Sequence, residues 1–266
     1  MKRTLLAALV VAAATLALAF LVLPIVAIFL RVPPGHLIDQ LSSPIVTDAL
    51  VVSFKTTAIA QVLILVFGTP LAWLIASRRF RGRALAITLV ELPLVLPPAV
   101  AGLGLLAAFG RFGLLSTNIA FTQTAVVFAV AFVSSPLYIR QGIAAFEAVD
   151  PNLVAASRTL GAGPGRTFFR VVLPLAFNGL AAGEALAFAR GLGEFGATIM
   201  FAGSLQGVTQ TLPLAIYSAF AITFDTALAM GALLVAISAI LLLVLKLVLS
   251  WRPSRSTSSF LFARSS

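Results

Sequence analysis

Long apolar runs recur along the whole sequence and constrain its fold more than any other feature. Each is about 20 residues long, which is what a helix needs to cross the hydrocarbon core of a bilayer. Backbone polar groups have no water partner there, and a helix satisfies them within one segment. Charged residues make up 10% of the chain and hydrophobic residues 61%, against about 25% charged in soluble domains. The sequence therefore predicts an all-α integral membrane protein.

About six transmembrane helices are expected, with short loops and no room for a second soluble domain. Their approximate bounds are 5–30, 49–76, 84–109, 119–139, 174–202 and 227–249. The first run exceeds the 7–15 apolar residues of a signal peptide, so a retained span is favoured over a cleaved signal.

Outside these spans the sequence predicts two smaller features. The apolar piece 203–226 is too short to span and contains Pro213, which favours a re-entrant or interfacial segment on the outer side. Residues 1–251 are expected to form one membrane domain, and 252–266 a short, basic, mobile tail.

The basic residues predict the orientation of the chain. The net charge of +10 would suggest nucleic acid binding in a soluble protein. Here the basic residues gather at alternate span ends, as expected for cytoplasmic loops. They are Lys2, Arg3, Arg78, Arg79, Arg81, Arg83, Arg140, Arg158, Arg166, Arg170, Arg252, Arg255 and Arg264. We expect a multi-pass protein of the cell membrane with both termini in the cytoplasm and no nucleic acid partner.

Little in the composition supports chemistry on this chain. There is no cysteine, which excludes disulfides and thiolate metal sites, and the single histidine, His36, lies in a polar loop. The glycine-rich run 161–165 lacks the Gly-Lys-Ser/Thr that completes a phosphate-binding loop. We therefore expect no metal site, no bound cofactor and no enzymatic activity.

One polar stretch, 150–174, lies between two apolar runs and reads DPNLVAASRTLGAGPGRTFFRVVLP. Asp150 is a good N-cap, and Pro151 suits the first helical position, where a missing N–H costs nothing. Gly161 can end the helix in the left-handed conformation. The pattern predicts a short capped helix at the cytoplasmic surface, on which a partner outside the membrane docks.

The same stretch resembles the cytoplasmic signature of binding-protein-dependent ABC importer permeases. That signature reads Glu-Ala-Ala, three residues, Gly, nine residues, an aliphatic residue, one residue and Leu-Pro. Gly161, Val171, Leu173 and Pro174 match it, whereas 155–157 reads Ala-Ala-Ser and lacks the glutamate. Glu147 and Asp150 are nearby acidic candidates to replace that glutamate. The residues expected to couple the chain to an ATPase are Asp150, Pro151, Ala155, Ala156, Ser157, Arg158, Gly161, Leu173 and Pro174.

A narrower resemblance concerns two other segments. Residues 191–220, GLGEFGATIMFAGSLQGVTQTLPLAIYSAF, and 91–106, ELPLVLPPAVAGLGLL, resemble the molybdate/tungstate importer permeases. Sulfate/thiosulfate permeases carry a related LGEFGA segment and remain the alternative, although TQTLPLAIY favours molybdate or tungstate.

The resemblance implies a type I ABC importer permease fold and a transport function. One copy offers too few helices for a sealed alternating pathway, so we expect a homodimer with the pore at its interface. The resemblance implies two separate ATPase subunits that carry ATP and Mg. It also implies a periplasmic or lipid-anchored binding protein that delivers the oxyanion. An ion-coupled secondary transporter is the alternative from another class, with Glu91, Glu184 and Glu194 as its ion sites.

Candidate pore or gate residues lie in the third and fifth spans and in the segment after them. Prolines break the third span, and freed backbone groups need protein or a wet cavity. Arg190 and Glu194, spaced i, i+4, either form a structural ion pair or stand beside an anion path. The candidates are Glu91, Pro97, Pro98, Arg190, Glu194, Thr198, Thr209, Gln210 and Thr211. The glycines at 191, 193 and 196 favour close helix packing, with local unwinding as the alternative.

Overall fold

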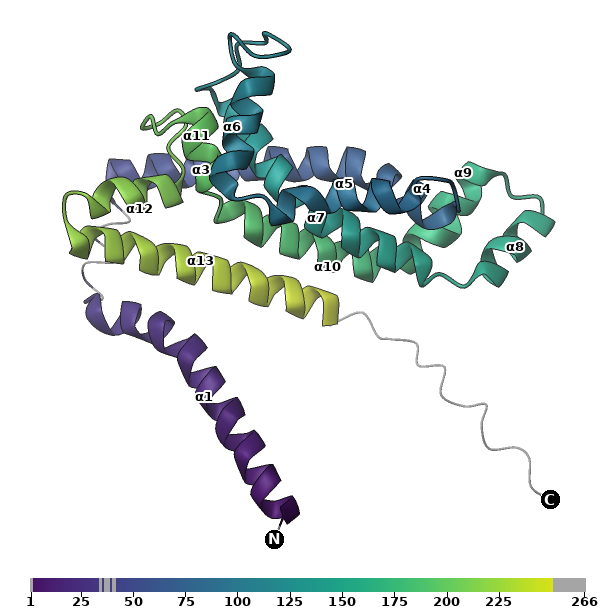
Figure 1. Ribbon diagram of the computed structural model, residues 1–266, viewed down its shortest axis with the longest axis horizontal. Coiled ribbons are helices and arrows are strands. Elements are labelled where there is room, and N and C mark those ends of the chain that lie inside the picture. The colour runs from purple at the N-terminus through teal and green to yellow at the C-terminus, as the bar shows by residue number, and fades with distance from the viewer. Residues whose placement is uncertain (1, 34, 36–38, 40–41, 251–266) are drawn as a thin grey trace.

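Helices make up all the regular secondary structure of the described residues (Figure 1). The computed structural model describes residues 2–33, 35, 39 and 42–250, without the side chains of 2–4, 245–246 and 248–250. His36 and the predicted tail, with Arg252, Arg255 and Arg264, lie outside these residues. The helices are α1 (Lys2–Arg31), α3 (Pro44–Leu63), η1 (Ile64–Gly68), α4 (Thr69–Ser77), α5 (Arg83–Val95), α6 (Pro98–Phe109), α7 (Gln123–Glu147), α8 (Pro151–Thr159), α9 (Pro164–Thr167), η2 (Phe168–Val172), α10 (Leu173–Leu192), α11 (Gly196–Ala202), α12 (Leu212–Phe220) and α13 (Phe224–Ser250).

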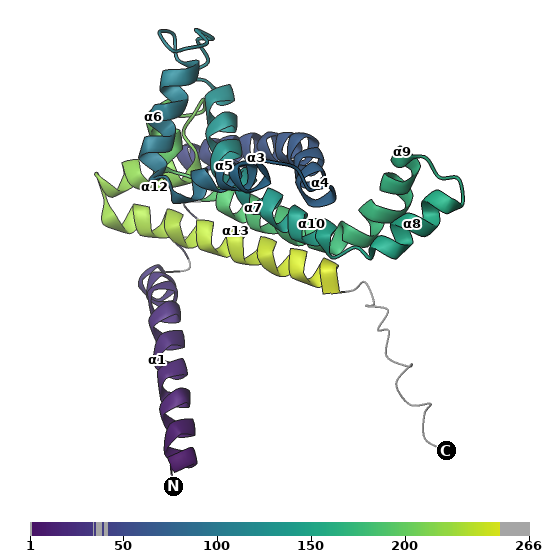
Figure 2. The same cartoon turned by 45° about the vertical axis from the view of Figure 1, so that its right-hand side comes forward.

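Five helical segments of the described chain are long and apolar enough to cross a membrane. A sixth span results if α5 and α6 are counted as one broken helix, which confirms the all-α fold with about six spans. In Figures 1 and 2, α3 with α4, α5, α7, α10 and α13 run side by side along one direction. The helices α11 and α12 lie at one end of this bundle and α8 at the other, which we call the α8 end.

Glycine allows the two central helices, α7 and α10, to approach closely. A Cβ on Gly179 would lie 2.5 Å from the Cβ of Ala145, and a Cβ on Gly183 would lie 2.8 Å from the Cβ of Gln141. Small residues at such contacts are the usual means of packing helices in a membrane. Gly191 continues the row, so close packing is confirmed for this glycine.

The third span breaks at its prolines, as predicted. The helices α5 and α6 meet at an angle of 113°, with Leu96 and Pro97 between them in extended conformation. Figure 1 shows α6 turned away from the direction of the bundle. The first turn of α6 therefore carries Pro98 at a helix start, where its missing N–H is harmless.

Two predicted span boundaries are wrong. The fourth span, expected at 119–139, is α7 and extends to Glu147, because Ile143 and Phe146 continue its buried face. Arg140 consequently lies inside α7 instead of just beyond the end of the fourth span. The fifth span, expected to run unbroken over 174–202, is helical over Pro164–Leu192 and is followed by the separate short helix α11.

Candidate functional site

The predicted docking helix is present as α8 and is capped at both ends. An Asp150 carboxylate oxygen accepts a hydrogen bond of 2.8 Å from the Asn152 N–H, and Pro151 occupies the first turn. Gly161 follows the helix with φ of +81°, in the left-handed region that favours glycine. The described part of α8 contains no buried residue, so this helix is held at the surface by its caps and its neighbours.

A side-chain hydrogen bond fastens α8 to the start of the fifth span. The hydroxyls of Ser157 and Thr167 lie 3.0 Å apart, and Thr167 is buried in α9. The helical segment continues without interruption through η2 into α10, with Leu173 and Pro174 in the first turn of α10. Ser157 thus connects α8 to the helical segment that contains α10.

Both acidic candidates to replace the missing glutamate of the signature have partners within the described chain. Glu147 pairs with Arg83, and Asp150 is occupied as the N-cap of α8. The exposed residues of the α8 motif are Ala155, Ala156 and Arg158. Position 155 is therefore neutral where the signature is acidic, and Arg158 is the charged residue exposed on this helix.

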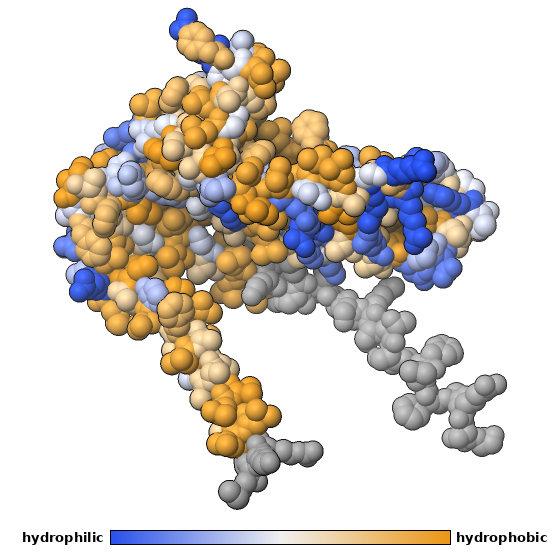
Figure 3. Space-filling view, viewed as in Figure 1, coloured by the Kyte–Doolittle hydropathy of each residue, from blue (hydrophilic) through white to orange (hydrophobic). Residues whose placement is uncertain are grey.

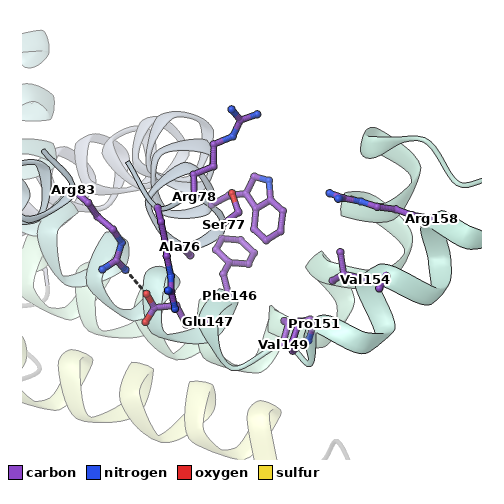
Figure 4. A pocket seen from close by; sticks show the side chains of 13 residues that line it. Ala76, Ser77, Arg78, Arg83, Phe146, Glu147, Val149, Pro151, Val154 and Arg158 are labelled. Atoms are coloured by element: carbon purple, nitrogen blue, oxygen red, sulfur yellow. Dashed lines mark hydrogen bonds and ion pairs between the residues drawn. The ribbon is translucent and has the colours of Figure 1, made fainter. Parts of the chain in front are cut away.

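A cavity of about 850 Å³ separates α8 from the end of α4. Figure 4 shows Arg158 reaching toward it from α8, with Arg78 and the Arg83–Glu147 pair on the opposite side. Arg78, Arg79 and Arg158 form no ion pair within the described chain, so the cavity carries a positive charge. Its inner wall is apolar, and Trp73 and Phe146 stack edge to face there with their ring centroids 5.3 Å apart.

Arg190 and Glu194 form an ion pair across the end of α10, which we call the buried pair. A terminal nitrogen of Arg190 lies 2.7 Å from a carboxylate oxygen of Glu194, and the two side chains are 35% and 1% exposed. The other carboxylate oxygen accepts a 2.8 Å hydrogen bond from the Ala197 N–H at the start of α11. Glu194 thus joins the two helices across the break at residues 193–195, while the Arg190 side chain stays partly open.

The breaks in the third and fifth spans are in contact. A Cβ on Gly196 would lie 2.6 Å from the Cβ of Pro98, and one on Gly102 would lie 2.5 Å from the Ala197 carbonyl oxygen. The structure therefore brings Pro98 together with the segment that follows Glu194. Close packing and local unwinding, which were alternatives for the 191–196 glycines, occur side by side.

The other predicted polar candidates are buried. Thr198, Thr209, Gln210 and Thr211 are at most 8% exposed. The Thr209 hydroxyl accepts a hydrogen bond from the Leu205 N–H, and the Gln210 amide lies within hydrogen-bonding distance of the Ser204 and Ser218 hydroxyls. The hydroxyls of Thr198 and Thr211 have no partner within the described chain. Within that part, no cluster of His, Cys, Asp and Glu could hold a metal ion.

Sequence reasoning missed a buried polar row on α3. The Ser53 hydroxyl accepts a 2.8 Å hydrogen bond from the Leu212 N–H at the start of α12. Gln61 is 4% exposed, its amide has no partner, and it lies beside Gly191 together with Ser134 of α7. The signal was present in the sequence, because glutamine is uncommon within an apolar span.

Glu91, a predicted pore candidate, forms a second ion pair that the sequence did not indicate. A carboxylate oxygen of Glu91 on α5 lies 3.1 Å from the Nε of Arg140 on α7. The side chains are 36% and 58% exposed, and we call them the open pair. At the α8 end the same two helices are joined again by Arg83 and Glu147, which we call the end pair.

Taken together, these features define a polytopic, all-helical membrane protein with a capped surface helix at one end and ion pairs on its long helices. Residues 68–252 match the family described as the binding-protein-dependent transport system inner membrane component. The match covers well over half of the chain, and the chain belongs to this family.

Individual relatives agree with this assignment. The chain is 45% identical to the molybdenum transport system permease protein ModB of Mycobacterium tuberculosis, over 84% of this chain and 88% of the relative. It is 43% identical to ModB of Escherichia coli K12, over 64% of this chain and 78% of the relative. A crystal structure of a bacterial alginate ABC importer has the same fold, with a TM-score of 0.70 at 18% identity over 95% of this chain and 97% of the other.

Proposed function

We propose that this chain is the membrane permease subunit of an ATP-driven importer of molybdate or its analogue tungstate. The observation that carries the proposal is α8, a capped surface helix tied through the Ser157–Thr167 contact to the helix that ends at the buried pair. The substrate is inferred from relatives named for molybdenum transport, which match most of the chain. The sulfate/thiosulfate alternative receives no support from these relatives.

The proposed assembly contains two copies of this chain, two ATPase subunits and a periplasmic or lipid-anchored binding protein. ATP and Mg bind to the ATPases, since this chain has no complete phosphate-binding loop. Both termini and α8 face the cytoplasm in this arrangement. Because Arg78, Arg79 and Arg158 surround the cavity beside α8, we expect acidic side chains on the facing ATPase surface.

Coupling follows from the way α8 is connected. ATP binding draws the ATPases together, and each ATPase moves the α8 that it holds. The Ser157–Thr167 bond and the continuous helix through η2 pass this movement to α10. The contacting breaks at Pro97–Pro98 and at 193–195 let the far ends of the third and fifth spans reorient, which opens the path outward. ATP can drive this change only because the ATPase holds one arrangement more tightly than the other.

Arg190 is the proposed oxyanion contact in the half of the path that is more distant from the α8 end. Its partly open guanidinium offers charge-assisted N–H donors to a tetrahedral dianion. A free arginine would retain a dianion, and transit requires weak contacts at several sites. Glu194 lowers the net charge at this position to zero. The remaining candidates, Thr198, Thr209, Gln210 and Thr211, stay predictions as neutral gate residues.

The test uses the complex co-purified with its ATPase and reconstituted with its binding protein. Molybdate should stimulate ATP hydrolysis, and excess sulfate should leave that stimulation nearly unchanged. Gly161→Val should uncouple hydrolysis from uptake, because a β-branched residue in the left-handed region costs about 1–2 kcal/mol and displaces the end of α8.

Gly163→Ala is the matched control for the Gly161 variant. Both glycines have open space around their Cβ positions, but φ at Gly163 is −66°, which alanine adopts readily. Gly163→Ala should therefore keep uptake coupled to hydrolysis. Normal molybdate uptake by Gly161→Val, or strong suppression by sulfate, would contradict the proposal.

A further inference from the structure

The open pair lies far from the α8 end along the bundle axis, and its distance from the end pair can be counted in residues. Arg140 precedes Glu147 on α7 by seven residues, and Glu91 follows Arg83 on α5 by eight. At 1.5 Å per residue the open pair is about 11 Å further from the α8 end than the end pair. The 25 residues of α7 are about 37 Å long against about 30 Å of hydrocarbon, so the Arg140 backbone falls within the membrane core.

An exposed ion pair at this depth cannot face lipid without a large cost. An arginine at the centre of a membrane helix costs about 3 kcal/mol even on the most lenient scale. A long side chain can reduce that cost by extending to the headgroups, but Glu91 holds the Arg140 guanidinium at its own depth. The 58% and 36% exposure of the two side chains therefore indicates water on this face of the bundle.

The surface around the open pair supports this interpretation. Figure 3 shows one hydrophilic area at the α8 end and another near the middle of the bundle, with hydrophobic surface between them. On α5, Thr88 is exposed one turn before Glu91. Polar surface therefore occurs near the middle of the bundle as well as at the basic cavity, although Leu85 and Leu89 of α5 are also exposed.

The contacts of Arg140 leave donors for a ligand. The printed contact of the open pair uses the Nε, and the two terminal nitrogens of Arg140 have no partner within the described chain. Two N–H groups on a guanidinium match the oxygens of a tetrahedral oxyanion. Glu91 balances the charge, so an anion is attracted by the donors without being held by a net positive charge.

We propose that Arg140, oriented by Glu91, is a second contact site for the transported oxyanion, in a water-filled path along α5 and α7. The inference rests on the proposed import of molybdate and adds a site to it. The row of α7–α10 contacts places Gly183 level with Gln141, so Arg190 lies about 10 Å further along the bundle than Arg140. The path then has two charge-balanced arginines in series.

The test exploits the absence of cysteine from the chain. Thr88→Cys places a thiol on the Glu91 side of α5, and Leu89→Cys places one on the opposite flank. Both positions are exposed in the structure. The two thiols therefore differ mainly in the side of α5 on which they lie. Each variant, in complex with the ATPase in inside-out vesicles, is treated with a membrane-impermeant, negatively charged methanethiosulfonate.

Thr88→Cys should react at least about tenfold faster than Leu89→Cys, because a thiol forms its reactive thiolate in water and stays protonated in lipid. Millimolar molybdate should slow the labelling of Thr88→Cys by about twofold or more, as occupancy of a weak site would. Adding Arg140→Gln should remove this protection while leaving Thr88→Cys reactive.

Two outcomes would overturn the inference. Equal labelling of the two thiols would mean that the open pair faces lipid or protein, and fast labelling of Thr88→Cys without protection by molybdate would mean a wet surface that binds no oxyanion. Failure of the proposed function is seen separately, as no molybdate-stimulated ATP hydrolysis by the wild-type complex, since the labelling assay requires no transport.

Discussion

The buried pair and the open pair are built from the same two residue types, yet they sit in opposite surroundings. Arg190 and Glu194 belong to one segment, and the Glu194 side chain is 1% exposed. Arg140 and Glu91 join two different helices, and both side chains are accessible. The difference arises from the backbone. Glu194 lies in a helix break, and the free Ala197 N–H at the start of α11 needs a hydrogen-bond acceptor, which Glu194 provides.

This contrast separates two uses of charge inside a membrane. In the buried pair the carboxylate satisfies an N–H group of α11 and holds the break closed, so its first effect is on structure. In the open pair no backbone group depends on Glu91 within the described chain, so its first effect is on the water and ions that reach it. Variants of the two glutamates should therefore fail in different ways.

The largest expected effect comes from neutralising Glu194. Glu194→Gln keeps an oxygen for the Ala197 N–H but leaves Arg190 without its counter-charge. Because the Glu194 carboxylate is buried and Arg190 is partly exposed, the loss of this charge-assisted contact should lower the free energy of unfolding by about 2–3 kcal/mol. Glu91→Gln, its matched control, should cost less than about 1 kcal/mol, as accessible pairs do. The measurement is thermal unfolding of both variants in the same detergent, and equal losses would remove the distinction between the two pairs.

The next effect tests the contact that supports the break beside the buried pair. Gly102→Ala would place a Cβ 2.5 Å from the Ala197 carbonyl oxygen, which belongs to the backbone and cannot move alone. Such overpacking typically costs about 1–3 kcal/mol. Gly104→Ala lies on the same helix with nothing within 4 Å of its Cβ. A loss of stability only in the Gly102 variant is expected in the same unfolding assay, whereas matching losses would show that α6 does not pack tightly on α11.

Local signals in the sequence were enough to predict some of these elements. Asp150, Pro151 and Gly161 specify the ends of α8 by cap chemistry that acts within a few residues. The prolines at 97 and 98 specify the break of the third span for the same reason. The apolar runs specify the number of spans, because length and composition decide whether a helix can cross a bilayer.

The remaining features depend on contacts between distant segments. From the sequence, unwinding near residues 193–195 was only an alternative to close packing, and Pro98 and Glu194 fix the break by packing and hydrogen bonding. The depth of Arg140 depends on Ile143 and Phe146 being buried against neighbouring helices, which no local pattern reveals. The i, i+4 spacing indicated the partner of Arg190, but the partners of Glu91 and Glu147 lie on other helices and could not be identified from the sequence.

Exchanging the two charges of the open pair should affect transport more than stability. In the double variant Glu91→Arg and Arg140→Glu the ion pair is retained, so the free energy of unfolding should change by less than about 1 kcal/mol. The guanidinium moves from α7 to α5, and its donors no longer face the same part of the path. Molybdate uptake by the reconstituted complex should fall several-fold, by the loss of about 1 kcal/mol of contact energy. Unchanged uptake would mean that the position of the guanidinium does not matter for transport. A large loss of stability would mean that the open pair, like the buried pair, acts mainly on the structure.

The smallest effect is expected at the end pair, which joins the same helices as the open pair but lies at the ends of α5 and α7. Glu147→Gln removes the charge opposite Arg83, which still donates from its Nε to the Ile75 carbonyl oxygen at 2.9 Å. Accessible pairs at helix ends contribute about 0–1 kcal/mol, so unfolding should be nearly unchanged. The labelling rate of Thr88→Cys should also stay the same, because water reaches the open pair through the path and not through an opening of the end pair. A marked rise in that labelling rate would show that Arg83 and Glu147 close the path at the α8 end. The end pair would then limit the access of water to the open pair.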